Sequence, residues 1–216
     1  MIDFANAQSI TIPEGEVASI ARNGEILWRK KYKKELAYLK STGTQYIDTD
    51  VNADSNLGFE ITYKIDSLTN TENRWGAIRQ NGSSYIRHHS SMDSAQGMLR
   101  YYFNIGDKGY LPTDLNKHTV SLDTDECTLT VDGVANSFEQ EVFDCRLNYW
   151  LFGRNGNTAS LTNYSKMTIY KCRLSKNGVL VRDLIPVLDW NDRPCMYDKV
   201  TDERFYNKGT GEFLYA

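Results

Sequence analysis

The sequence predicts an all-β fold, a two-sheet antiparallel jelly-roll sandwich with a small N-terminal β-hairpin segment. Two observations carry this prediction: dipeptides that favour tight hairpin turns recur along the chain, and the runs between them alternate polar and apolar residues. Asn or Asp followed by Gly tolerates the positive φ angles that a type I′ turn needs at both central positions. Such dipeptides occur at Asn23-Gly24, Asn81-Gly82, Asp132-Gly133, Asn155-Gly156 and Asn177-Gly178.

The runs beside these dipeptides have the two-residue period of half-buried strands. Residues 119–122 (TVSL) and 128–131 (TLTV) alternate polar and apolar side chains. Residues 147–152 (LNYWLF) are almost continuously apolar, which predicts a central strand covered on both faces. The one segment with helical character, residues 31–39, is short and charged. Strands joined by turns in a chain of this length are typical of a sandwich or jelly roll.

The composition changes at residues 29–34, where RKKYKK concentrates five cations. Before this break, residues 10–28 form a predicted β-unit whose hairpin is too small to bury a core of its own. We therefore divide the chain into an attachment segment with a hairpin and basic linker, residues 1–33, and a sandwich, residues 34–216. A charge run of this kind is typical of a solvated linker. The alternative is contact with an acidic partner surface.

Charge and hydropathy exclude several classes of partner. The chain has 25 basic and 28 acidic residues and a formal charge of −3, so nothing attracts it overall to phosphate backbones or anionic lipid. We expect no nucleic-acid binding and no membrane insertion, because no stretch approaches the ~20 apolar residues of a membrane span. The first residues lack the basic and apolar regions of a secretory signal, which predicts synthesis in the cytoplasm without a signal peptide.

The cysteines are too far apart for the CxxC pairs of zinc ribbons or thioredoxin-like sites. We predict buried free thiols, the usual state of unpaired cysteine. One or two disulfides formed after release from the cell are the alternative. The four residues are Cys127, Cys145, Cys172 and Cys195.

Catalytic motifs are missing from the sequence. Retaining glycosidases need two carboxyl groups about 5 Å apart, and sandwich-fold glucanases carry them in an E-x-D-x-x-E pattern that does not occur here. His88, His89 and His118 do not have the HExxH spacing of zinc hydrolases. A GxSxG elbow, a P-loop and a GxGxxG motif are also absent. We therefore predict no catalytic residues and a protein that is not an enzyme.

Residues 36–216 resemble a known family. The stretch ELAYLKSTGTQYIDTDV is similar to the opening strand pair of concanavalin A-like, laminin-G-like domains of gut-bacterial and phage proteins. Three further matches follow in order: YWLFGRNGN, YSKMTIYKCRLSKNGVLVRDLIPV and MYDKVTDERFYNKGTGEF. The resemblance implies a lectin-like sandwich, the same fold that the residue pattern predicts.

Laminin-G relatives often carry calcium, which makes a cation at Asp123 and Asp125 an alternative to be weighed. The acidic run 123–126 lies between two predicted strands and has the generic spacing of a turn. We therefore predict no metal site and no cofactor, with calcium as the less favoured alternative.

The N-terminal segment is similar to the start of short structural proteins of phages, in which IDFANAQSI-x-IPEGEV leads into a hairpin. This resemblance implies that residues 1–33 bind other phage virion proteins and that the sandwich is displayed on the virion. Such a protein would be made in the host cytoplasm, leave by lysis and act extracellularly. Multivalent display or a homo-oligomer would then turn weak single-site affinity into useful avidity.

A ligand patch for sugars should combine aromatic faces, arginine forks and planar amides on exposed β surface. Residues 74–89 combine these types most densely, and alternation places Tyr85, Arg87 and His89 on one face of a strand. The alternative is that Trp75 and Tyr85 belong to the core. A second candidate is the loop at residues 154–157, which otherwise is a plain hairpin turn. The predicted ligand-binding residues are Arg74, Trp75, Arg79, Tyr85, Arg87, His89, Tyr101, Arg154, Asn155 and Asn157.

These inferences predict a non-enzymatic, virion-associated protein whose lectin-like domain binds a host-surface glycan or receptor. The alternative from another class is a purely structural decoration or tail protein that stabilises the capsid or tail. A sandwich-fold glycosidase is the least favoured alternative.

Overall fold

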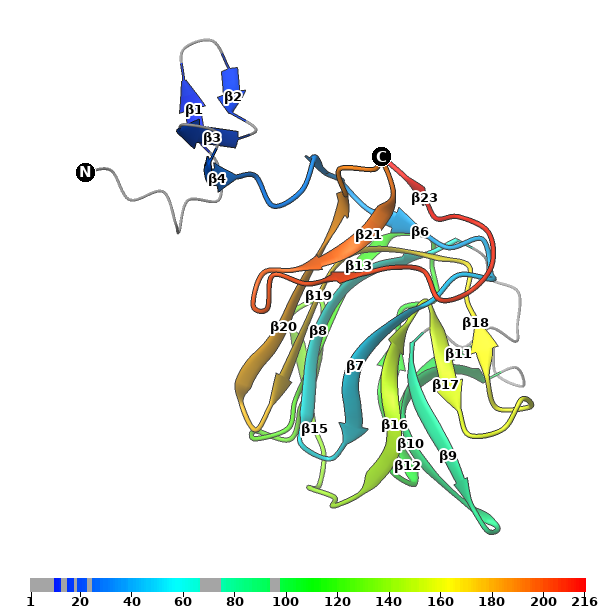
Figure 1. The fold of residues 1–216 in the computed structure, drawn as a ribbon. Coiled ribbons are helices and arrows are strands. Elements are labelled where there is room, and N and C mark those ends of the chain that lie inside the picture. The colour runs from blue at the N-terminus through cyan, green and yellow to red at the C-terminus, as the bar shows by residue number, and fades with distance from the viewer. Residues whose placement is uncertain (1–9, 13–14, 18, 23–24, 67–74, 94–97) are drawn as a thin grey trace.

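The computed structural model describes residues 10–12, 15–17, 19–22, 25–66, 75–93 and 98–216. Within these ranges every regular element is a strand, and two sheets pack face to face (Figure 1). This confirms the predicted all-β, two-sheet antiparallel sandwich. The same ranges contain no helix that is long and apolar enough to span a bilayer.

The smaller sheet has the strand order β12-β11-β10-β9-β16-β7. Strand β17 adds to it by pairing in parallel with β9, and β18 pairs with β17. Its strands are β7 (Ile47–Asp54), β9 (Gly76–Asn81), β10 (Ser84–Asp93), β11 (Met98–Phe103), β12 (Gly106–Leu111), β16 (Asp144–Leu151), β17 (Gly153–Gly156) and β18 (Asn163–Tyr164).

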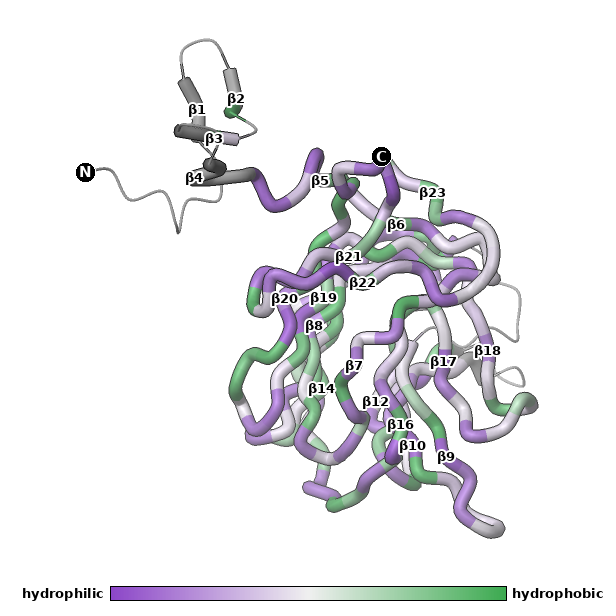
Figure 2. The backbone as a smooth tube through the Cα atoms, in the orientation of Figure 1, coloured by the Kyte–Doolittle hydropathy of each residue, from purple (hydrophilic) through white to green (hydrophobic). Residues whose placement is uncertain are grey.

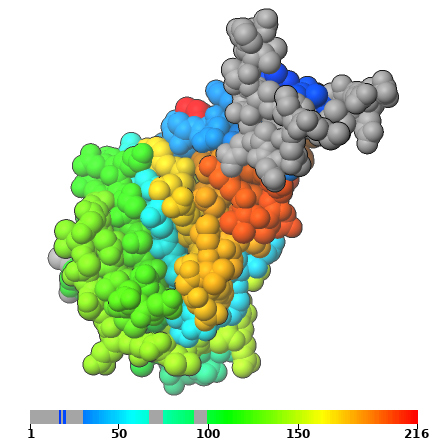
Figure 3. Space-filling view, turned by 90° about the vertical axis from the view of Figure 1, so that its left-hand side faces the viewer, coloured from blue at the N-terminus to red at the C-terminus, as the bar shows by residue number. Residues whose placement is uncertain are grey.

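The larger sheet has the order β15-β14-β13-β8-β19-β20-β21-β22, with β5, β6 and β23 at its side. Figure 3 shows its outer face, where β19 and β20 (gold) lie between cyan β8 and the orange β21–β22 hairpin. Its strands are β5 (Lys34–Glu35), β6 (Leu39–Lys40), β8 (Leu57–Ile65), β13 (Lys117–Asp123), β14 (Thr128–Val131), β15 (Val134–Ser137), β19 (Met167–Lys176), β20 (Val179–Leu188), β21 (Pro194–Asp198), β22 (Arg204–Phe205) and β23 (Leu214–Tyr215).

Two short hairpins precede the sandwich and stand apart from it in Figure 1. The first pairs β1 (Ile10–Ile12) with β2 (Gly15–Val17), and the second pairs β3 (Ser19–Arg22) with β4 (Glu25–Arg29). The predicted turn at residues 23–24 lies outside the described residues.

The other predicted turns have different outcomes. Asp132-Gly133 and Asn177-Gly178 form two-residue turns with positive φ at both positions, as a type I′ turn requires. The turn after β9 is shifted by one residue, because Asn81 pairs with Ser84 and Gly82 is the first central residue. The prediction at Asn155-Gly156 is wrong, since both residues belong to β17 and pair along β9.

The core lies between the sheets and is rich in aromatic side chains. Polar and apolar residues alternate along the strands, so each strand turns one face inward (Figure 2). In β8 the odd-numbered residues from Leu57 to Ile65 are buried in this core. Strand β16 lies inside the sheet, between β9 and the edge strand β7, and Asn148 and Trp150 on its outer face are only half-buried. The prediction that both its faces are covered is therefore wrong.

A chain of hydrogen bonds crosses the buried core. The Nε2–H of His88 donates to the carbonyl of Leu57 (2.8 Å), so its Nδ1 accepts from the Tyr101 hydroxyl (2.5 Å). The Tyr149 hydroxyl then donates to the Tyr101 oxygen (3.0 Å). All three side chains are fully buried, and burial lowers the pKa of His88 to about 4. His88 is therefore neutral at physiological pH and belongs to the framework.

Replacing Tyr101 with phenylalanine is expected to lower the free energy of unfolding by about 3 kcal/mol. The change keeps the ring but leaves His88 Nδ1 and the Tyr149 hydroxyl buried without their partner, at roughly 1 to 3 kcal/mol for each orphaned group. Urea unfolding measures the loss, and Tyr102→Phe is the control on the same strand. Equal stabilities of the two variants would contradict the role of the network.

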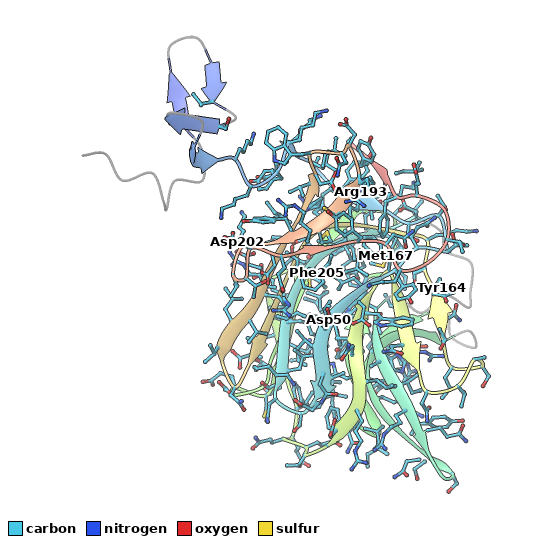
Figure 4. All side chains as sticks on the ribbon, in the orientation of Figure 1. Asp50, Tyr164, Met167, Arg193, Asp202 and Phe205 are labelled. Atoms are coloured by element: carbon cyan, nitrogen blue, oxygen red, sulfur yellow. The ribbon has the colours of Figure 1, made fainter. Side chains whose placement is uncertain are left out.

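The basic run before the sandwich is held by the sandwich's own acidic side chains. Lys31 forms an ion pair with Asp202, and Lys33 forms one with Asp192, each at 2.6 Å. Asp202 lies on the loop between β21 and β22 (Figure 4). These pairs are exposed, so each contributes little to stability, but they compensate the cations within the chain. The basic run is therefore not a fully solvated linker, because Lys31 and Lys33 pair with carboxylates of the same chain.

The cysteines are free thiols, as predicted. Cys145, Cys172 and Cys195 are buried, whereas Cys127 is partly exposed at the turn after β13. Burial raises the pKa of Cys145 and of Cys195 to about 12, so both thiols stay protonated and unreactive at neutral pH.

Candidate functional site

The outer face of the smaller sheet carries a hollow of about 260 Å³. Strand β10 supplies four of its lining residues, because side chains two residues apart share a face and the intervening His88 points into the core. Strand β17 and the segment after it reach the same place by pairing along β9 (Figure 1). We call it the arginine hollow; its lining consists of Ile78, Tyr85, Arg87, His89, Ser91, Tyr102, Arg154 and Leu161.

Arg87 lies between two tyrosine rings of this hollow. Its guanidinium carbon is 5.3 Å from the centre of the Tyr85 ring and 5.1 Å from that of Tyr102, within the range of cation–π attraction. Its Nη1 donates to the carbonyl of Ile105 at 3.4 Å, a long and weak bond. The two rings thus fix the guanidinium while leaving most of its donors uncommitted among the described residues.

Arg154 is the second cation of the hollow. Its Nε donates to the Leu161 carbonyl at 2.9 Å, which holds the side chain against the segment after β17. Burial, followed by repulsion from Arg87, lowers the pKa of the Arg154 guanidinium to about 10. The group remains charged at neutral pH. Among the described residues, no carboxylate forms an ion pair with either arginine, and none lines the hollow.

His89 forms part of the wall between these cations. Its Nδ1–H donates to the Ser90 carbonyl (2.9 Å), and its ring stacks on Tyr102 with centroids 5.4 Å apart. Burial and then the charge of Arg154 hold the pKa of His89 well below its usual value, so the ring is neutral. Its Nε2 is a buried acceptor that no described residue satisfies.

The structure therefore brings Tyr85, Arg87 and His89 together with Arg154, which the sequence placed in a separate candidate. Their role in ligand binding stays a prediction.

The placement of Trp75 and Tyr101 on a binding surface is wrong, because both side chains are fully buried in the core. The Trp75 ring packs 4.8 Å from that of Tyr63. Arg79 is also misplaced: it lies on the other face of β9 from the hollow and donates to the Asp144 carbonyl at 3.2 Å. Arg74 lies outside the described residues.

Asn155 and Asn157 hold the framework beside the hollow and do not line it. Asn155 Nδ2 donates to the carbonyl of Asn148 at 2.9 Å. The Asn157 amide imitates a strand: its Oδ1 accepts from the Gln80 N–H (2.9 Å) and its Nδ2 donates to the Gln80 carbonyl (3.1 Å). Both side chains fix the segment that carries Arg154, so the interpretation of Asn155 and Asn157 as ligand contacts is corrected to a structural role. Arg154 of the same loop lines the hollow.

Tyr102 is the main site residue that sequence reasoning missed. Of the two adjacent tyrosines on β11, the sequence predicts Tyr101 as the ligand contact. His89 pairs with Tyr102, and a shift of one residue reverses which side chain faces the core. Alternation along β10 and β11 predicts that Tyr102 lies beside His89 only when the pairing register of the two strands is known.

A second hollow, of about 260 Å³, lies where the edge strands β7 and β22 of the two sheets meet, and Figure 4 labels Asp50 and Phe205 of its lining. It contains Asp50 and Glu203 opposite Arg204 and Lys208, so its formal charges balance. Burial, then repulsion from Asp48, raises the pKa of Asp50. This balance distinguishes it from the arginine hollow, which holds cations alone among its described lining.

Three stacked rings form an aromatic ladder near the second hollow. The ring of Tyr46 lies 3.9 Å from that of Trp150 and 5.6 Å from that of Tyr164, with interplanar angles of 26° in both pairs. The Trp150 Nε1–H donates to Asp48 at 3.1 Å. All three rings are half-buried, and no sequence pattern connected these positions, since they come from three distant segments.

The described residues contain no group of three or more His, Cys, Asp or Glu side chains arranged to hold a metal ion. At the acidic run proposed for calcium, residues 124–127 form the predicted turn. Asp123 Oδ1 accepts from the N–H groups of Asp125 and Glu126, both at 2.9 Å. The carboxylate thus caps the turn, which explains its presence without a cation.

No family model matches the chain, and no curated protein matches it. Among solved structures, the chain is similar to "Trypanosoma rangeli sialidase in complex with 2,3-difluorosialic acid (covalent intermediate)" with 16% sequence identity and a TM-score of 0.41. The match covers 74% of this chain but only 30% of the sialidase chain.

Proposed function

We propose that the sandwich is a non-catalytic glycan-binding domain and that its ligand occupies the arginine hollow. One observation carries the proposal: two guanidinium groups and two tyrosine rings converge on a concave surface whose described lining holds no carboxylate. Guanidinium forks donate to the oxygens of a sugar, and the tyrosine rings, which hold Arg87, add apolar surface and phenolic hydroxyl groups to the same site. The absence of a carboxyl pair from this lining also leaves glycoside hydrolysis without its usual acid and nucleophile there.

The size of the hollow supports a small ligand unit. Its volume of about 260 Å³ is just below the roughly 300 to 1,000 Å³ typical of sites for drug-sized ligands. One sugar ring with its substituents fits this space, and the rest of a glycan would extend into solvent. Affinity for one ring is expected to be weak, so the function depends on several copies binding together.

The proposed setting is a phage virion. The resemblance of residues 1–33 to phage structural proteins supports attachment of this segment to other virion proteins, and the sandwich would then face the host surface. The rival proposal, a structural decoration or tail protein, assigns the same attachment but no ligand. A glycosidase is the third reading.

Staining of host cells by the purified full chain tests the binding proposal. We expect a fluorescent, multimerised form of the protein to label intact cells and the isolated surface polysaccharide. Labelling should fall at least tenfold when Arg87 is replaced by glutamine, since a charge-assisted contact is lost. Chromatography of the polysaccharide after incubation should show no shortened product. Particles that need the protein for integrity, combined with no labelling at any valency, would favour the structural reading instead.

A further inference from the structure

We infer that the arginine hollow recognises a single carboxylated sugar unit, a hexuronate or a nonulosonate, within a host glycan. The inference rests on the proposed function and names the ligand class of the same site.

Uncompensated charge is the first argument. Arg87 and Arg154 face one hollow, and the pKa of Arg154 is lowered by burial and by Arg87. Cations withdrawn from water are normally paired, and both arginines are half-buried. Arg100 on the same sheet, for example, forms an ion pair with Asp107. The described residues offer the two cations of the hollow no such partner, so an anionic group of the ligand supplies the missing charge.

The geometry of guanidinium favours a carboxylate as that group. A guanidinium is a planar fork whose parallel N–H donors match the two oxygens of a carboxylate. Arg154 commits its Nε to the Leu161 carbonyl, and the rings of Tyr85 and Tyr102 hold Arg87 in place. Both forks are therefore positioned before the ligand arrives, which reduces the entropy lost on binding.

His89 provides the argument for a sugar rather than a simple acid. The side chain is 2% exposed and lines the hollow, and its Nε2 is an acceptor with no partner among the described residues. A neutral imidazole nitrogen of this kind accepts a hydrogen bond, and a sugar hydroxyl is a suitable donor. Sugar acids present a carboxylate and hydroxyl groups on one ring, so a single ligand unit satisfies both the cations and the histidine.

The arrangement also predicts a conflict between binding and stability. If Arg154 served the fold, its loss would destabilise the protein. Because the charge of Arg154 is repelled by Arg87, Arg154→Gln is expected to leave the midpoint of thermal unfolding unchanged or raise it, while ligand binding falls. A stabilising change that costs function is the mark of a binding residue.

The experiment measures binding of the full chain to glycans in matched pairs. Each hexuronate or nonulosonate oligosaccharide is compared with its carboxyl-reduced counterpart, which has the same ring and linkage but a hydroxymethyl group. We expect binding to at least one acidic member and a loss of about 10- to 100-fold on reduction, the value of one or two charge-assisted bonds. Arg87→Gln and Arg154→Gln should give a similar loss, and Arg154→Lys, which keeps the charge without the fork, a smaller one.

Arg173→Gln is the matched control, because Arg173 is an arginine of the larger sheet, half-exposed and paired with Asp183. The Arg173→Gln variant should bind the acidic oligosaccharides as tightly as the unchanged protein does. Equal binding of acidic and reduced oligosaccharides would overturn the inference but leave the proposed function intact. The inference would also fail if the chain bound sulfated dextran as tightly as the acidic oligosaccharides and neither Arg87→Gln nor Arg154→Gln weakened that binding. If no acidic member binds, the inference fails, and neutral glycans and host cells in the same assay then decide the proposed function separately.

Discussion

Replacing Gly76 with alanine is expected to lower the free energy of unfolding by about 4 kcal/mol. Gly76 has φ of +114°, a conformation that costs residues with a side chain roughly 1 to 3 kcal/mol. A Cβ there would also lie 2.2 Å from the carbonyl oxygen of His88 and 2.6 Å from the Cα of His89, and such overpacking costs roughly 1 to 3 kcal/mol more. The residue begins β9 and pairs with β10, β16 and β17, so no neighbour can move aside freely.

Gly82→Ala provides the matched control for Gly76→Ala. Gly82 also has a positive φ, +62°, but a Cβ at this position meets nothing within 4 Å. Its replacement should therefore cost only about 1 kcal/mol, the price of the left-handed conformation. Urea unfolding of both variants measures the difference. Equal losses in the two variants would show that the close packing of β9 against β10 is not as described.

Acidification from pH 6.5 to pH 5 is expected to remove about 2 kcal/mol of stability through His88 alone. Its folded-state pKa of about 4 lies below the value of 6.5 in the unfolded chain. The unfolded state therefore takes up the proton first, and the stability is present above pH 6.5 and lost as the pH falls toward 4. His89, whose pKa is lowered by burial and by Arg154, changes stability in the same direction.

His118 makes this test specific. Burial lowers its pKa, but the hydrogen bonds that its ring N–H groups donate to Asp114 and Asp132 outweigh burial and raise the pKa overall. The stability from His118 is therefore present below pH 6.5 and lost as the pH rises, the opposite sign to His88. Free energies of unfolding should fall with acid in the unchanged protein and in His118→Gln, and fall less steeply in His88→Gln. Identical slopes for the unchanged protein and His88→Gln would refute a buried neutral His88.

The sequence predicted the sandwich because the features that define it are local. Two-residue alternation and turn dipeptides act within a few residues, and Asp132-Gly133 and Asn177-Gly178 do form the expected turns. Asn155-Gly156 has the same local chemistry but continues as a strand, because β9 offers it a parallel neighbour. The conformation of Asn155-Gly156 thus depends on pairing with a strand that is distant in the sequence, and the neighbouring residues do not predict it.

The candidate site was predictable to the same extent. Tyr85, Arg87 and His89 share one face of one strand, so alternation alone grouped them. Arg154 joins them only through the pairing of β17 with β9, and Tyr102 only through the register of β11 against β10. Trp75 is a residue type that often stacks on sugars, but its side chain packs in the aromatic core.

Titration of the arginine Nε–Hε signals in the ¹⁵N–¹H spectrum of the full chain tests the central claim most directly. With a bound glycan from the matched panel, the signals of Arg87 and Arg154 should shift in a saturable way while that of Arg173 on the larger sheet stays unchanged. Saturable binding that leaves the Arg87 and Arg154 signals in place would contradict a glycan site in the arginine hollow.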